Sequence, residues 1–130
     1  MGPNFYIDLS GWLIVALFAT TVVIAVGFRS RIEEHYAIGY GIAALSFLHA
    51  SLAVDALNVS GIQLYGILVA TAAMFISWGQ VALGRRLRAL PPAGRRLTRT
   101  FHIATASTLL VLGAWHLIVN GPHLHFLLRL

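Results

Sequence analysis

Hydrophobic residues fall into four long blocks along the chain, at approximately 9–28, 36–57, 62–83 and 101–119. Each block approaches the roughly 20 apolar residues that an α-helix needs to cross a bilayer. Short polar segments separate the first three blocks, and a longer segment, 84–97, precedes the fourth. That segment is expected to be a loop, because Pro91 and Pro92 interrupt helices. The pattern predicts an all-α, integral membrane four-helix bundle of up-and-down topology, with residues 1–130 as one domain.

Composition supports a chain surrounded by lipid. Hydrophobic residues make up 58% of the 130 residues and charged residues only 10%, whereas a soluble domain carries about 25% charged residues. There is no cysteine, which excludes thiolate-ligated iron–sulfur clusters, disulfides and covalent c-type haem within this chain. A b-type haem is held only by axial side chains and packing, so it remains compatible with the composition.

The chain has a net charge of +5, and all nine of its basic residues are arginines. The distribution of these arginines predicts how the chain is oriented in the membrane. Eight of the nine arginines lie in 29–31 and 85–99, and only Arg129 lies elsewhere. By the positive-inside rule these segments face the cytoplasm, and both termini face the other side. We expect a multi-pass protein of the bacterial inner membrane. The basic segments are expected to contact lipid headgroups, and no nucleic-acid partner is expected.

Four histidines within the hydrophobic blocks form two pairs of equal spacing. His35 and His49 are fourteen residues apart in the second block, and His102 and His116 are fourteen apart in the fourth. Fourteen residues are two heptads, so both histidines of a block share one helix face, about 21 Å apart. The two blocks run in the same direction, which places His35 level with His102 and His49 level with His116. Histidines inside spans are costly and usually functional, and this arrangement predicts two bis-histidine haem b sites.

Residues near the histidines suit such a cofactor. Gly39 lies one turn after His35, and Gly113 lies one turn before His116. A small residue at these positions lets a flat macrocycle approach the backbone. Glycines also mediate helix packing in membranes, which is the alternative role for both residues. Arg31 and Arg99 are expected to neutralise the propionates of the haem nearer the cytoplasm. Three hydroxyl side chains are candidates either to orient the imidazoles or to bond to the nearby backbone: Ser46, Thr105 and Ser107.

The histidine pattern resembles the four-helix haem core of the cytochrome b/b6 family. In that family the second and fourth helices each carry two histidines at this kind of spacing and hold two haems, which matches His35, His49, His102 and His116. More loosely, the chain resembles b561-like cytochromes and the cytochrome b subunits of hydrogenases and dehydrogenases. The resemblance implies a membrane-anchor subunit that transfers electrons within a respiratory or photosynthetic oxidoreductase complex. Its expected partners are membrane lipid, the other redox subunits and a quinone.

The resemblance is limited to spacing and helix order. The family's second helix starts from the opposite side of the membrane, and its PEWY-type motif and later helices are absent here. The sequence also has no flavin, iron–sulfur or nucleotide motif. We therefore expect an electron-transfer subunit rather than a complete enzyme.

Two other function classes remain open at this point. One is a cofactor-free accessory subunit that packs against a larger membrane complex. The other is a small transporter or proton channel whose histidines relay protons or bind a metal. Equal depth of the histidines on two parallel helices favours haem, because a proton path does not require it.

Overall fold

The computed structural model describes residues 3–55 and 61–120, and the long elements in these ranges are all α-helices. They are α1 (Pro3–Gly27), α2 (Ile32–Asp55), α3 (Gly61–Ala89) and α4 (Arg95–Asn120). The short 3-10 helices η1 (Arg29–Arg31) and η2 (Pro92–Gly94) lie in the connections. Four segments are long and apolar enough to span a membrane: Phe5–Gly27 in α1, Ile32–Val54 in α2, Tyr65–Ala89 in α3, and Pro92–Ile118, which comprises η2 and most of α4. The prediction of an all-α chain with four candidate membrane spans is confirmed.

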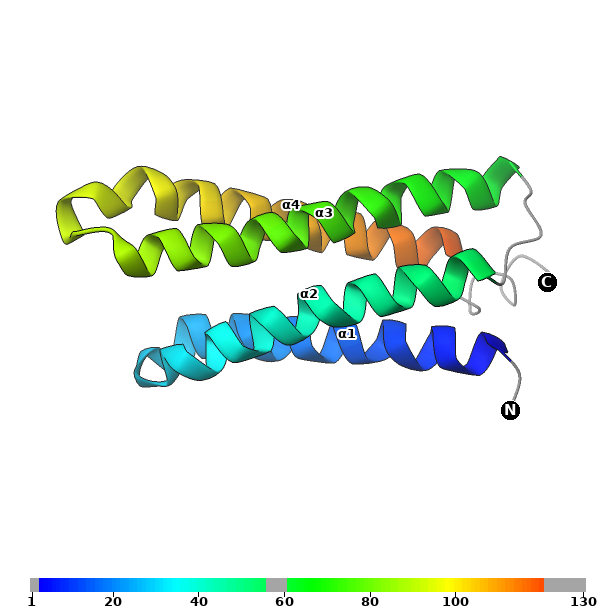
Figure 1. Cartoon of the computed structure of the whole chain (residues 1–130), viewed down its shortest axis with the longest axis horizontal. Helices are drawn as coiled ribbons and strands as arrows, with labels where there is room; N and C mark the ends of the chain where they lie inside the picture. The colour runs from blue at the N-terminus through cyan, green and yellow to red at the C-terminus, as the bar shows by residue number, and fades with distance from the viewer. Residues whose placement is uncertain (1–2, 56–60, 121–130) are drawn as a thin grey trace.

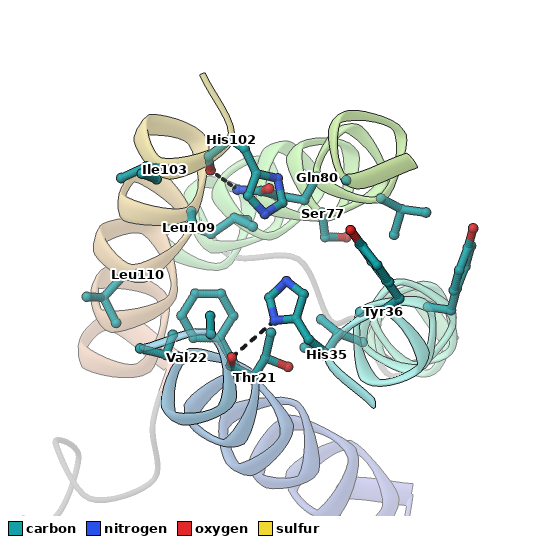
Figure 2. Close-up of a pocket in the computed structure, with 18 of the residues that line it drawn as sticks. Thr21, Val22, His35, Tyr36, Ser77, Gln80, His102, Ile103, Leu109 and Leu110 are labelled. Carbon is teal, nitrogen blue, oxygen red and sulfur yellow. Dashed lines mark hydrogen bonds between the residues drawn. The ribbon is translucent and has the colours of Figure 1, made fainter. Parts of the chain in front are cut away.

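The helices form two hairpins that lie side by side (Figure 1). One hairpin is α1 and α2, the other is α3 and α4, and both turn at the same end of the molecule. The hairpins meet mainly along α2 and α3, whereas α1 and α4 pack much less closely. In the end-on view of Figure 2, α2 and α4 stand on opposite sides of the bundle. The two histidine-bearing helices therefore face each other across the interior.

The helix boundaries differ from the sequence expectation at the arginine-rich end. Segment 84–97 is not a long loop, because α3 continues to Ala89 and α4 begins at Arg95. Arginines are compatible with helix, and positive charge near a helix C-terminus interacts favourably with the helix dipole. Only the residues around Pro91 and Pro92 break the helix. Arg85, Arg86 and Arg88 consequently lie on α3, which gives them fixed directions relative to the bundle interior.

The bundle has an apolar exterior and few fully buried side chains. Among the described residues, the buried hydrophobic ones are Ile24, Ile42 and Ala43. Large apolar side chains instead point outward on every long helix, as Val23, Leu68 and Val111 do. In a bilayer such surfaces contact lipid tails. The four spans and this surface indicate a multi-pass membrane protein in contact with lipid.

Candidate functional site

The four histidines meet in two pairs inside the bundle. The ring centres of His35 and His102 are 6.2 Å apart, and those of His49 and His116 are 6.0 Å apart. Each pair joins α2 to α4, and the pairs are those that the spacing predicts. We call His35 and His102 the inner pair, because they lie toward the arginine-rich end, and His49 and His116 the outer pair.

Hydrogen bonds from α1 fix the tautomers of both α2 histidines. His35 Nδ1 lies 3.2 Å from the carbonyl oxygen of Thr21, which can only accept, so Nδ1 carries the proton. Ser10 Oγ donates its single proton to the carbonyl oxygen of Ile7 at 2.9 Å. It must therefore accept from His49 Nδ1, which is also 2.9 Å away. Both Nε2 atoms then keep a lone pair, which is the state in which histidine ligates a metal.

The rings of the two α4 histidines differ in their contacts with α3. The backbone of Gly66 is a hydrogen-bond partner of the His116 imidazole. His102 Nδ1 is buried and has no hydrogen-bond partner among the described residues. Figure 2 shows His35 and His102 with a ring nitrogen of each directed toward the other ring. The inner pair thus presents two nitrogens across one shared space.

A cavity of about 370 Å³ surrounds the inner pair (Figure 2). Ligand pockets typically measure about 300–1,000 Å³. Apolar side chains such as Val22, Ile103 and Leu110 form much of the lining. Arg85 and Arg88 also line the cavity and belong to the last turns of α3. The cavity therefore combines an apolar wall, two imidazoles and a cationic end.

Three buried polar atoms around this cavity lack hydrogen-bond partners. They are Thr21 Oγ1, Gln80 Oε1 and His102 Nδ1, and all three residues line the cavity. They are also the full set of such side-chain atoms found in the described part of the chain. Buried polar groups normally have a partner, either protein or an ordered molecule. Their concentration here supports the cavity as a place that accommodates something besides the protein.

The pairs fit a metal ion held between two imidazoles. A metal–imidazole nitrogen bond is about 2 Å long and the ring centre lies about 1 Å beyond, so two opposed imidazoles have centres about 6 Å apart. The observed 6.2 and 6.0 Å agree with this separation. Among the side chains that the structure describes, there is no group of three or more potential metal ligands. A haem iron needs only two from the protein, because the porphyrin supplies the other four ligands.

The two predicted glycines differ in their positions. Gly39 lines the inner cavity, and a Cβ built there would meet no atom within 4 Å. A Cβ on Gly113 would also meet none, but Gly113 is outside this cavity's lining. The space beside Gly39 is therefore part of the cavity itself.

The two predicted arginines lie away from the cavity lining. Arg31 is exposed and its Nε is 3.8 Å from an Oε of Glu34, and Arg99 is exposed on α4. The cavity contacts Arg85 and Arg88 instead. Because segment 84–97 was expected to be a loop, Arg85 and Arg88 were not predicted to face the cavity. A continued helix would have shown Gln80, Gly84 and Arg88 on one face at four-residue intervals.

The hydroxyls considered as imidazole partners bond to their own helices. Ser46, Thr105 and Ser107 donate to the carbonyl oxygens of Ile42, Phe101 and Ile103 at 2.8, 2.8 and 3.1 Å. The sequence allowed these hydroxyls either to orient the imidazoles or to bond to the nearby backbone, and the structure shows the second role. In the described part of the chain, the hydroxyl hydrogen-bonded to a histidine ring is that of Ser10 on α1, at the start of the first apolar block.

Arg88 links the two hairpins beside the inner pair. Its Nη1 lies 3.0 Å from an Oε of Glu33 on α2, and its guanidinium carbon is 5.6 Å from the ring centre of Tyr36. The ion pair is exposed, so its own contribution to stability is small. Together with the ring contact, however, it holds a cation at the end of the cavity.

Gly11 allows α1 to approach the outer pair. A Cβ at Gly11 would lie 3.3 Å from His49 Cε1, so the ring would have to shift by a few tenths of an ångström. We expect Gly11→Ala to lower metal or haem occupancy at the outer pair roughly tenfold. Gly79→Ala is the matched control, because an added Cβ there meets no atom within 4 Å and Gly79 does not line the inner cavity. Equal haem content in Gly11→Ala and Gly79→Ala would contradict the prediction.

A scan against protein-family models and searches of the curated proteins and of the solved structures find no match for this chain. The function of this chain is therefore inferred from the histidine pairs, the cavity and their surroundings.

Proposed function

We propose that this chain transfers electrons across a membrane through two b-type haems. His35 and His102 would hold one haem, and His49 and His116 the other. The observation that carries this proposal is the pair of ring separations, 6.2 and 6.0 Å, between helices α2 and α4. When bound, a haem supplies reversible one-electron oxidation and reduction of its iron. Two histidines per site leave no open iron position, so binding and activation of oxygen are disfavoured.

Hydrogen bonds orient two of the imidazoles that would hold the haems. Ser10 and the Thr21 carbonyl keep the Nδ1 protons of His49 and His35, which orients the rings and leaves each Nε2 as the basic nitrogen. Such hydrogen bonds also raise the basicity of a ligating imidazole. Along α2 the two sites are separated by fourteen residues, or about 21 Å of helix. This separation suits one site near each side of a hydrocarbon core about 30 Å thick.

The inner cavity provides the space and the counter-charge for a carboxylate-bearing macrocycle. Gly39 contributes open space next to His35, and most of the lining is apolar, as a macrocycle requires. Arg85 and Arg88 are the cationic side chains at the cavity, so we assign them the binding of the carboxylates. Arg31 and Arg99 remain available at the same end of the bundle, outside the lining.

We further propose an up-and-down bundle in the bacterial inner membrane, with both termini on the non-cytoplasmic side. The two hairpin turns and their arginines lie at one end of the molecule (Figure 1), as the positive-inside rule requires of a cytoplasmic face. A quinone-linked oxidoreductase complex would supply the catalytic subunits, because this chain contributes only the electron path. Its partners would be those subunits, a quinone and lipid.

The test is haem content and spectrum of the purified chain. The protein is purified in mild detergent from cells with adequate haem supply, and a dithionite-reduced minus oxidised spectrum is recorded with a pyridine haemochrome assay. We expect a b-type α-band and close to two haems per chain. Absence of haem would overturn the proposal. A cofactor-free accessory subunit would then remain, or a transporter, which flux across proteoliposomes would identify.

A further inference from the structure

Three of the four histidine rings have a hydrogen-bond partner on the helix that precedes their own. His35 and His49 on α2 bond to Thr21 and Ser10 on α1, and His116 on α4 bonds to the Gly66 backbone on α3. This arrangement predicts that His102 should have a partner on α3 as well. In the structure its Nδ1 is buried and without a partner in the described part of the chain.

Gln80 is the α3 residue placed to provide that partner. Its Nε2 donates to the carbonyl oxygen of His102 at 2.7 Å, so the amide is already fixed against this residue. The other end of the same amide, Oε1, is buried and has no partner. Gln80 and His102 both line the inner cavity and lie next to each other in Figure 2. Two residues that are already hydrogen-bonded to each other therefore each carry an unsatisfied buried polar atom, an acceptor on Gln80 and a potential donor on His102, which is costly unless the two atoms meet.

We propose that Gln80 is the positioning residue for His102: its Oε1 accepts the Nδ1 proton when His102 Nε2 ligates the inner haem. The inference rests on the proposed function and assigns a residue that tunes one of its two sites. Accepting this proton gives the imidazole more anionic character and makes it a stronger donor to the metal. A stronger donor favours the ferric over the ferrous state, so Gln80 lowers the reduction potential of the inner haem.

Gln80→Met in the haem-loaded protein tests this, because methionine has similar length but is a poor acceptor. We expect a potentiometric titration to show the inner haem about 59 mV higher, which is a tenfold change for a one-electron couple. The outer haem should not move. The inner haem is identified as the component lost in His35→Ala. Gln80→Glu keeps an acceptor oxygen at the same length, and its inner potential should stay at or below the wild-type value.

Two matched variants control the experiment. Trp78→Phe changes an α3 side chain that is 51% exposed and is not among the residues that line the inner cavity. It should leave both potentials unchanged. Ser10→Ala removes the acceptor of His49 and should raise the outer potential alone.

The possible failures are distinguishable. If wild-type protein carries two haems but Gln80→Met shifts neither potential, the inference about Gln80 is overturned and the proposed function stands. The same holds if Gln80→Met only lowers haem content and the remaining inner haem keeps its potential, since that is a purely structural role. If the wild-type protein binds no haem, the proposed function itself fails.

Discussion

Replacing His35 with alanine is expected to halve the haem content of the purified chain. The inner site would keep only His102 and would lose the hydrogen bond that ties the α2 ligand to the Thr21 carbonyl oxygen. A b-type haem has no covalent attachment, so one missing axial ligand removes much of its binding free energy. The outer pair is about 21 Å away along α2 and should retain its haem. The pyridine haemochrome assay, normalised to protein, measures the change.

The other histidines provide the internal controls. His102→Ala should remove the same spectral component as His35→Ala, whereas His49→Ala and His116→Ala should remove the other component. Phe47→Ala, on the same helix but 60% exposed on the outside, should keep both haems. If His35→Ala and His102→Ala removed different components, the pairing across the bundle would be wrong.

Gly39→Leu is expected to exclude the inner haem although both of its histidines remain. A Cβ at this position enters open space within a cavity of about 370 Å³, so a leucine side chain would occupy volume that the macrocycle needs. Close-packed interiors accommodate such additions poorly. We expect inner-site occupancy to fall at least tenfold, with the outer haem retained. Reduced-minus-oxidised spectra and haem stoichiometry would show the loss.

Gly41→Leu is the matched control for this substitution. Gly41 lies on the same helix two residues later, it is exposed, and an added Cβ there also meets no atom within 4 Å. It is not one of the residues that line the cavity. Two haems in Gly41→Leu and one in Gly39→Leu would place the macrocycle in this cavity. Two haems in both variants would mean that the cavity is not its binding site.

Much of the architecture could be predicted from the sequence because the relevant signals are local. Runs of apolar residues set the four spans, since a helix must be apolar over its whole membrane-crossing length. The fourteen-residue spacing determined that His35 and His49 share one helix face, and likewise His102 and His116. Arginine clusters at the two turns placed His35 and His102 near the same end of the bundle. Those three facts were enough to predict which histidines meet.

Only the tertiary structure decided what surrounds each histidine. The α1 sequence is apolar on all sides, so it does not mark which face turns inward, and the contacts of Ser10, Gly11 and Thr21 could not be predicted. The length of α3 beyond the apolar block was equally hidden, because arginine suits both a helix end and a loop. The rotation of α1 and α3 about their axes, set by packing, brings Ser10, Gln80 and Arg85 to the sites. Helix spacing thus fixed the pairs, and helix rotation fixed their hydrogen bonds and charges.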